Sequence, residues 1–283
     1  MGEFYHERQG PLMPSGSTIG FDRPAVVWSS LDHGEAPSAA LGGLTIKHVA
    51  AGAPVFHSFA GRTYKVSPGQ FLCVPPETSG SGEIRKGGGR THGFCLFIPA
   101  IAAAPELPVI LPTACSALGR LLDSHAAAMA SPAADRRGIA ARVLAGTIAE
   151  LEPLLAEVAA QLDGLGMARP RSRFDAYRKL NVARAFLHDV TDRAVPLAEL
   201  AEVAGMSPFQ LLRRFQDGFG ETPSVYHRRL RLRLARRAVE SGVLDCQGAA
   251  DSFGFAGGSS FSHAHRRAFG AAPVRTRTAA SAA

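Results

Sequence analysis

The sequence predicts an α+β protein with two domains, a β-rich N-terminal domain and an all-α C-terminal domain. Short runs of branched and aromatic residues, separated by turns with Gly or Pro, extend from about residue 25 to residue 98 and indicate a small antiparallel barrel. From about residue 114 the apolar residues recur at helical spacing instead. A length of 283 residues suits two domains that each bury a core.

Positive charge is concentrated in the C-terminal domain. Residues 171–283 carry 18 Lys and Arg against 10 Asp and Glu, whereas the rest of the chain carries 13 against 14. This excess indicates a polyanionic partner, although a basic surface that only meets solvent has the same composition. The four cysteines show no C-x-x-C spacing, and we find neither a signal peptide nor an apolar run of membrane length. We therefore expect a cytoplasmic protein with free thiols and no membrane partner.

The N-terminal domain is expected to begin after a flexible arm. Residues 1–24 are rich in Gly, Pro and Ser and show no sustained period. The predicted barrel follows at residues 25–112. Its expected strands lie at residues 25–28, 43–49, 62–66, 70–74 and 94–98.

Residues 113–165 are predicted to be helical, with helices at 114–130 and 133–162. Pro153 should kink or restart the second helix. Six apolar residues of that helix repeat at steps of four and three, which is the spacing of a coiled-coil seam. A helix that lies on its own barrel needs the same stripe. The six residues are Leu144, Ile148, Leu151, Leu155, Val158 and Leu162.

A linker rich in Gly, Pro and Arg is expected at residues 166–173, before the C-terminal domain at residues 174–277. That domain should open with a helix at 174–190, because Tyr177, Leu180 and Leu187 give it an apolar face. Residues 278–283 are expected to form a disordered tail.

The C-terminal domain contains an internal repeat at a spacing of about fifty residues. Its two copies are PLAELAEVAGMSPFQLLRRFQDGFGETP and DCQGAADSFGFAGGSSFSHAHRRAFGAAP. We therefore expect the same fold in both copies. Alignment pairs Gly205 with Gly254, Leu211 with Phe261, Phe215 with His265, Gly220 with Gly270 and Pro223 with Pro273.

Each copy has the pattern of a helix-turn-helix. In the first, a helical stripe of apolar residues ends at Gly205, a residue type that tolerates positive φ. Ser207 is a good N-cap for a second helix, and Pro208 suits its first position. Apolar side chains then recur at Leu211 and Phe215, so the residues between them should face outward.

The tandem pattern closely resembles the DNA-binding domain of AraC/XylS-type transcriptional regulators. It consists of A-G-M-S-P-F-x-L-x-R-x-F-x-x-x-x-G-x-x-P followed by G-F-x-x-x-S-x-F-S-x-x-x-R-R-x-F-G-x-x-P, over roughly residues 176–277. A single helix-turn-helix pattern is weak, because any short helical hairpin imitates it, but two in tandem are specific. The resemblance implies two helix-turn-helix units joined by a long helix, a cupin-like sensor barrel, and a dimer formed by the seam at residues 133–162.

The segment GRTYKVSPGQFLCVPP is similar to the rim and strands of a cupin-like barrel. A cupin enzyme holds a metal with several His and a Glu at fixed spacing. Here His48, His57 and His92 are scattered, and no H-x-H occurs. We therefore expect no metal, no cofactor and no enzyme activity.

Two polar patterns suggest an anionic effector. Arg85 and Arg90 enclose three glycines whose backbone N–H groups can approach an anion, unless RKGGGR is only a basic hairpin loop. Arg169 and Arg173, together with the segment 77–82, are similar to the cyclic-di-GMP signature of PilZ domains, with the order reversed and Glu77 at the first position. A cyclic dinucleotide is one option for the unidentified effector. The expected contacts are His57, Arg62, Tyr64, Ser79, Gly82, Arg85, Arg90, Arg169 and Arg173.

The family pattern also assigns the residues that face DNA. Arg213 matches the O6 and N7 acceptors of guanine, whereas the second unit is poorer in discriminating groups and suits phosphate contacts. His265 and Ala249 stand where the family usually has a Phe and a larger aliphatic residue, which should loosen the second unit. The expected DNA contacts are Phe209, Gln210, Leu212, Arg213 and Arg214 in the first unit, and Gly258, Ser259, Ser262, His263, Arg266 and Arg267 in the second.

Residues 224–240 are predicted to form a stiff connecting helix with a narrow apolar face at Val225, Leu230, Leu234 and Ala238. Such a helix would hold the two recognition helices about 34 Å apart, so that they meet successive turns of the major groove. Part of its run of six arginines is expected to be only a solvated face.

The expected function is a ligand-responsive, sequence-specific transcriptional regulator that binds double-stranded promoter DNA as a homodimer. Activation is the commoner outcome in the family and implies RNA polymerase as a partner. Two alternatives remain, a cupin-type enzyme with an accessory DNA-binding module and an effector-independent DNA binder. The first would contain a bound metal, and the second would show no preference for a promoter.

Overall fold

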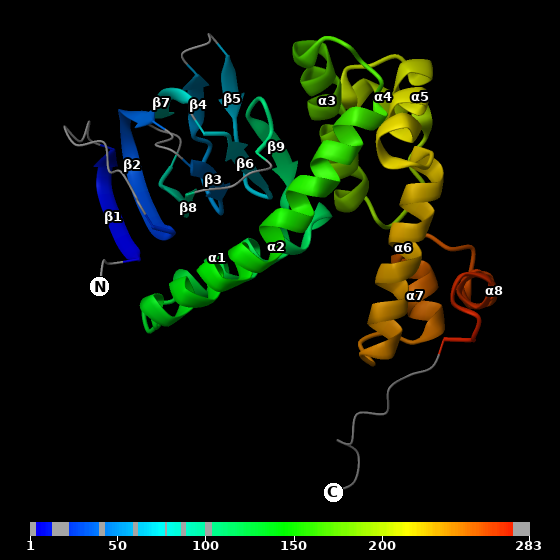
Figure 1. The fold of residues 1–283 in the computed structure, drawn as a ribbon. Coiled ribbons are helices and arrows are strands. Elements are labelled where there is room, and N and C mark those ends of the chain that lie inside the picture. The colour runs from blue at the N-terminus through cyan, green and yellow to red at the C-terminus, as the bar shows by residue number, and fades with distance from the viewer. Residues whose placement is uncertain are drawn as a thin grey trace, which may run out of the picture. The chain divides into compact units, whose positions relative to one another are not determined.

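The computed structural model describes residues 4–12, 23–39, 43–58, 62–76, 78–85, 89–99 and 104–273. The chain forms two compact units, Met1–Asn181 and Val182–Ala283. The first contains a β-sheet and two long helices, and the second is helical (Figure 1). The predicted α+β fold class is therefore confirmed.

The first unit is built on a sheet of nine strands among the described residues, in the order β5-β4-β7-β2-β8-β3-β6-β9, with β1 paired to β2. All pairings are antiparallel except the parallel pairing of β1 with β2, and the sheet is nearly closed into a barrel. The strands are β1 Tyr5–Leu12, β2 Ala25–Ala39, β3 Gly43–Val49, β4 Val55–Ser58, β5 Thr63–Lys65, β6 Gln70–Val74, β7 Ser79–Ile84, β8 Thr91–Pro99 and β9 Val109–Pro112.

The expectation of a flexible arm at residues 1–24 is wrong for β1. This strand lies along β2, and the N–H of Val26 donates to the carbonyl oxygen of Phe4 at 2.8 Å. A parallel pairing has no local turn signal, and the polar segment YHERQGPL shows no apolar alternation, so the sequence does not reveal the strand. Residues 13–22 lie outside the described residues.

One part of the barrel core is a cluster of the buried side chains of Val49, Phe56, Tyr64, Val66, Leu72 and Val74. Beside it, the polar strand β7 was not predicted, because its sequence SGSGEI contains two glycines. A Cβ at Gly80 would lie 2.2 Å from the carbonyl oxygen of His57, so only glycine permits the close approach of β7 to β4.

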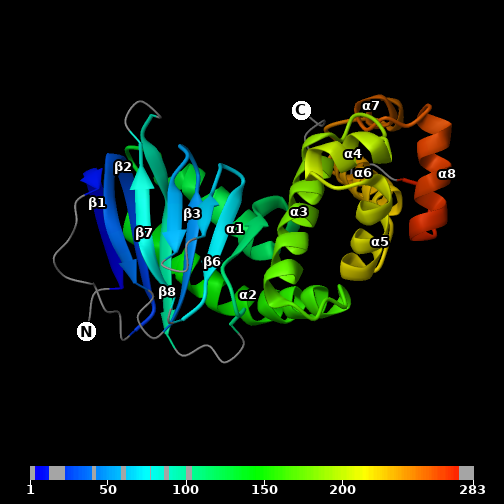
Figure 2. The same ribbon diagram turned by 90° about the horizontal axis from the view of Figure 1, so that it is seen from above.

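Two helices follow the sheet, α1 Ala117–Met129 and α2 Arg136–Gly164, after a short 3₁₀ turn at Thr113–Cys115. Ser116 and Asp135 cap them by accepting the N–H groups of Gly119 and Gly138. Within the first unit, α1 and α2 contact each other, and each contacts a strand of the sheet (Figure 2).

Helix α2 continues through Pro153, so the predicted restart does not occur. Pro inside a helix costs about 3 kcal/mol, but Leu151, Leu154 and Leu155 are buried on both sides of it, and their burial offsets this cost. Of the six predicted seam residues, Leu151, Leu155, Val158 and Leu162 lie in the core of the chain, and Leu144 is half-buried. Ile148 alone of the six is exposed, at 53%.

Helix α3, Pro170–Asp189, spans the boundary between the two units. The predicted linker 166–173 is therefore too long, because its last four residues form the first turn of α3. Pro suits this first helical position, since its missing N–H would have no intrahelical partner there.

The second unit contains both predicted helix-turn-helix pairs, α4 with α5 and α7 with α8, and the long helix α6 between them (Figure 1). Gly205 and Gly220 have positive φ of 60° and 75° at the ends of α4 and α5, as expected for helix C-caps. The predicted tail at residues 278–283 lies outside the described residues. The helices are α4 Leu197–Ala204, α5 Pro208–Phe219, α6 Pro223–Glu240, α7 Cys246–Ser252 and α8 Gly258–Phe269.

Candidate nucleic-acid interface and effector site

The first turn of helix α5 is polar and aromatic, and a cap and buried side chains hold the helix in place. Ser207 and Gln210 form a reciprocal capping box, and Leu211 and Phe215 are fully buried. Phe209 is 74% exposed, which is unusual for a phenyl ring in a folded domain. The first turn therefore carries an apolar side chain that the domain itself does not use.

Of the other predicted contacts on α5, Arg214 is half-buried and the rest are exposed. Leu212 and Arg213 are exposed, and the side chain of Arg213 keeps 66% of its area accessible. Arg213 and Arg214 both lie 3.8 Å from the same carboxylate oxygen of Asp217, which gives two long, shared ion pairs. Exposed pairs of this kind are weak, so a phosphate or a base edge can compete for Arg213. The carboxamide oxygen of Gln210 accepts from the N–H of Ser207, which commits part of this side chain to the cap.

An aromatic cluster fixes α5 on its neighbours. The ring of Phe215 meets Phe219 and Tyr226 edge-on at 4.7 Å and 5.6 Å between centroids. The guanidinium of Arg184, on α3, lies 4.5 Å from the Phe219 centroid, and His188 shares a hydrogen bond of 2.8 Å with the Tyr226 hydroxyl. Helices α3, α5 and α6 thus form a rigid support for the exposed turn.

Helix α8 is the equivalent of α5 in the second helix-turn-helix pair, but the start of α8 differs from that of α5. Ser259 and His263 are exposed, as are Arg266 and Arg267, while Gly258 and Ser262 are half-buried. The N–H of Gly258 donates to Oε1 of Gln247 at 3.1 Å, so this backbone group is engaged within the domain. The contact of Gly258 with DNA therefore stays a prediction.

His265 is buried and takes over the aromatic packing of the predicted Phe position. Its ring lies 5.8 Å from Phe261 and 4.7 Å from Phe269, and Nδ1 donates to the carbonyl oxygen of Ala271 at 2.7 Å. Nε2 is buried without a hydrogen-bond partner among the described residues. A buried polar atom without a hydrogen bond destabilises the fold, which agrees with the expected loosening of the second helix-turn-helix pair. The loosening itself stays a prediction.

Two buried polar side chains of helix α6 bind backbone groups next to the first helix-turn-helix pair and within the second. The sequence analysis did not identify these two side chains. His227 donates from Nε2 to the carbonyl oxygen of Val190 at 2.7 Å, before α4. One turn later, Arg231 donates to the carbonyl oxygens of Phe253 and Gly254 at 3.2 and 3.0 Å, in the turn between α7 and α8. Burial lowers the pKa of Arg231 from its usual value.

The predicted apolar face of α6 needs correction, because Val225 is exposed and Leu234 and Ala238 are only half-buried. The observed buried set is wider, since α6 contacts α5 as well as α7 and α8. Of its arginines, Arg229 pairs with Glu221 and Arg236 with Glu240, whereas Arg228, Arg233 and Arg237 are exposed. The buried residues of α6 are Pro223, Tyr226, His227, Leu230, Arg231, Leu232, Ala235 and Val239.

The expected effector residues of the barrel are only partly brought together. His57 and Arg85 both bind Glu83, at 3.0 Å and 2.9 Å, and these bonds lower the pKa of that carboxyl. Arg85 also lines a cavity of about 260 Å³ together with Lys65 and Gly89. Arg90 pairs with Asp32 at 2.7 Å. Tyr64 belongs to the barrel core, and Arg62 is half-buried.

The cyclic-dinucleotide arrangement gains no support. Arg173 pairs with Glu106 and Asp163 at 3.6 Å each, and Arg169 is exposed. Gly82 lies in β7, where it pairs with Ala36 of β2 and with Phe56 of β4. Glu77, the side chain of Ser79 and the three residues 86–88 lie outside the described part of the chain.

Two properties of the described residues bear on other site types. No cluster of three or more His, Cys, Asp or Glu side chains within them is arranged to hold a metal ion. None of their helices combines the length and the apolar character that a membrane span requires.

The paired helix-turn-helix units, each with an exposed second helix, define a DNA-binding domain of the helix-turn-helix class. Comparison with known proteins agrees, because residues 200–279 match the family model described as a helix-turn-helix domain. The tandem pattern of the C-terminal domain resembles that of AraC/XylS-type regulators.

The relatives cover different shares of the chain. A probable transcriptional regulator, LumQ of Photobacterium leiognathi, is 32% identical over 90 residues, which are 32% of this chain and 36% of LumQ. The chain thus spans about a third of the length of this curated relative. An AraC-type regulator from Chromobacterium violaceum is 28% identical over 34% of this chain and 87% of its own, with a TM-score of 0.33. ToxT of Vibrio cholerae, solved with a bound unsaturated fatty acid, is 10% identical over 91% of this chain and 95% of its own, also with a TM-score of 0.33.

Proposed function

We propose that the protein is a ligand-responsive transcriptional regulator whose C-terminal domain binds promoter DNA sequence-specifically. The observation that carries this proposal is the exposed face of the first two turns of α5, with Phe209 and Arg213 on a capped helix whose other face is buried. A recognition helix contacts base edges with its N-terminal residues, which supports contacts of these two side chains in the major groove. The basic balance of residues 171–283 adds attraction to the phosphates.

The two helix-turn-helix pairs have different roles in this proposal. Arg213 forms a forked contact with guanine, and Phe209 and Leu212 make apolar contacts, such as with a thymine methyl. Helix α8 contributes Ser259, His263, Arg266 and Arg267, which add affinity through phosphate contacts. The stiffness of α6 sets the spacing of the two helices at about one turn of DNA, roughly 34 Å.

Binding of labelled duplexes tests this function. Fluorescence anisotropy of the full chain with its own upstream region, and with a scrambled duplex of equal length, should give tighter binding to the first. The affinity should also fall steeply as salt rises, because bound counterions are released. Equal affinity for both duplexes would favour a sequence-indifferent DNA binder, and no binding at low salt would remove the proposal.

The N-terminal barrel is the proposed sensor, with a small molecule as effector and a homodimer as the active form. ToxT was solved with an unsaturated fatty acid, so apolar acids belong in a screen beside sugars, aromatic acids and cyclic dinucleotides. Because four seam residues are internal, a dimer through α2 would have to use the exposed Ile148. Sedimentation of Ile148→Asp against Glu152→Gln, an exposed change on the same helix, tests this surface. Activation through RNA polymerase would appear as increased transcription from the bound promoter.

A further inference from the structure

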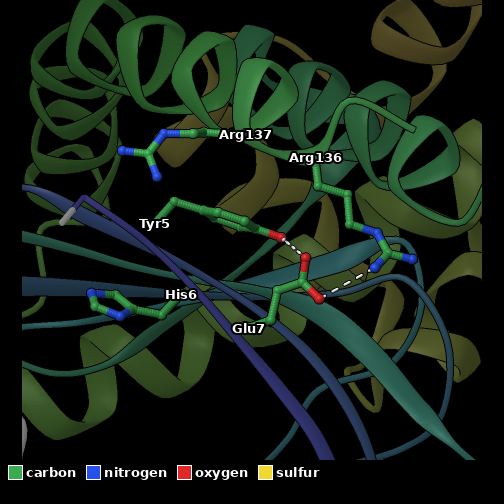
Figure 3. Close-up of a pocket in the computed structure, with 5 residues that line it drawn as sticks. All are labelled: Tyr5, His6, Glu7, Arg136 and Arg137. Atoms are coloured by element: carbon green, nitrogen blue, oxygen red, sulfur yellow. Dashed lines mark hydrogen bonds and ion pairs between the residues drawn. The ribbon is translucent and has the colours of Figure 1, made fainter. Parts of the chain in front are cut away.

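The polar groups around a cavity of about 490 Å³, between β1 and the start of α2, bind one another (Figure 3). The Tyr5 hydroxyl donates to Oε1 of Glu7 at 2.5 Å, and Nη1 of Arg136 donates to Oε2 at 3.2 Å. The carboxylate of Glu7 therefore satisfies the donors on both sides of it, and these groups call for no ligand.

The exposed face of α5 differs, because it carries apolar side chains beside a cation. Phe209 and Leu212 are 74% and 37% exposed, and the side chain of Arg213 keeps 66% of its area accessible. Residues three and four positions apart on a helix are neighbours, with Cβ atoms about 5–6 Å apart, so Phe209 adjoins both Leu212 and Arg213. The three side chains form one surface, here called the α5 surface, which is apolar at one end and cationic at the other.

The backbone beneath the α5 surface is held in place. The capping box of Ser207 and Gln210 fixes the first turn, and the fully buried side chains of Leu211 and Phe215 fix the opposite face. A partner that covers the exposed ring therefore gains the free energy of apolar burial without having to order the helix first. That partner needs an apolar group next to acceptors for a guanidinium.

The major groove of DNA offers this combination. Its apolar group is the 5-methyl of thymine, and the O6 and N7 acceptors of guanine match the fork of an arginine. Successive base pairs are about 3.4 Å apart along the duplex, so two side chains about 5–6 Å apart reach base pairs that adjoin each other. A pyrimidine with a 5-methyl group next to a guanine would occupy both ends of the α5 surface.

We propose that Phe209 covers the 5-methyl group of the pyrimidine next to the guanine bound by Arg213, and that it accepts 5-methylcytosine there as well as thymine. The two bases share the methyl group and differ at C4, where thymine has an acceptor and cytosine a donor. A phenyl ring has no polar atom with which to distinguish them. Methylation of a cytosine at this place would therefore strengthen binding. The inference rests on the proposed function, because it requires α5 to lie in the major groove.

Matched duplexes test the proposal by fluorescence anisotropy of the full chain. The parent duplex is the motif that the wild type selects from a random pool, and its four versions carry thymine, uracil, 5-methylcytosine or cytosine next to the guanine. Thymine and uracil differ only by the methyl group, as do 5-methylcytosine and cytosine. The wild type should bind the methylated member of each pair about fourfold more tightly, as expected for one buried methyl group.

The variant Phe209→Ala assigns this preference to the ring. It should bind both members of each pair equally, so that both affinity ratios fall to about one. Because Phe209 is exposed, the melting temperature should stay at its wild-type value. Val243→Ala replaces another exposed apolar side chain, which is 75% accessible and lies between α6 and α7, and should keep the wild-type ratios.

The possible failures of the inference and of the proposed function are distinguishable. A selected motif without a pyrimidine beside the guanine, or equal affinity of the wild type for both members of each pair, would overturn the inference and leave sequence-specific binding intact. Fourfold ratios that persist in Phe209→Ala would assign the methyl group to another residue. Unchanged affinity of this variant for every duplex would assign the ring to a protein partner, and either result would also overturn the inference. Selection of no motif at all would remove the proposed function together with the inference.

Discussion

The imidazole of His227 donates from Nε2 to the carbonyl oxygen of Val190 at 2.7 Å, and this bond ties the connecting helix α6 to the segment that precedes the first helix-turn-helix. Burial lowers the pKa of His227, the bond to Val190 opposes this change, and the charges of Arg231 and Arg193 lower the pKa further. The folded domain therefore holds a neutral imidazole with its proton on Nε2.

The lowered pKa of the buried His227 predicts that the C-terminal domain loses stability in weak acid. Below about pH 6.5 the unfolded chain binds a proton that the folded His227 does not, so the stabilising contribution is fully present above that pH and is lost below it. His227→Gln keeps an N–H donor for Val190 but does not titrate. As the pH falls from about 8 to about 5, the melting temperature of the wild type should fall relative to that of the variant. A constant difference between the two melting temperatures would show that His227 titrates alike in the folded and the unfolded chain.

Arg231 is predicted to hold the second helix-turn-helix pair, α7 and α8, on α6. Arg231→Gln should leave the carbonyl groups of Phe253 and Gly254 without this donor, at a cost of about 1 to 3 kcal/mol. Hydrogen exchange of the amides in α7 and α8 should accelerate accordingly. Arg237→Gln, an exposed arginine of the same helix, is the control and should leave their exchange unchanged. Equal protection in both variants would mean that the apolar core around Phe261 holds this unit alone.

The turns within the two helix-turn-helix pairs predict different losses of folding stability when a turn glycine is replaced by alanine. Gly205 and Gly254 both have positive φ, but a Cβ at Gly205 meets no atom within 4 Å, whereas one at Gly254 lies 2.4 Å from the carbonyl oxygen of Asp192. Gly205→Ala should cost about 1 kcal/mol from backbone strain. Gly254→Ala adds a steric clash with backbone and should cost clearly more in urea unfolding. Similar costs for both variants would contradict the close packing of this turn against Asp192.

Local patterns allowed prediction of most of the C-terminal domain, because Gly205, Ser207 and Pro208 determine helix ends through their own backbone chemistry. The buried bonds of His227 and Arg231 could not be predicted in the same way. Their partners lie 37, 22 and 23 residues away, and an arginine in a run of six looks like a solvated side chain.

The N-terminal domain shows the same limit. Strand β1 depends on a parallel pairing with β2, and Glu7 meets Arg136 across 129 residues, so no local pattern predicts either contact. The seam on α2 was ambiguous because the core of a single chain and a dimer interface require the same apolar spacing. Burial of Leu151 and Leu155 within the chain assigns that part of the stripe to the core.

Selection of binding sites from a random duplex pool tests most directly whether α5 determines which DNA sequence is bound. The wild type should select a defined motif, and Arg213→Ala should lose about 1 to 3 kcal/mol of discrimination at one guanine while the rest of the motif persists. His263→Ala, at an exposed position of α8, should weaken binding with little change in the motif. The opposite pattern, with the motif kept by Arg213→Ala and altered by His263→Ala, would contradict the assignment of sequence preference to α5.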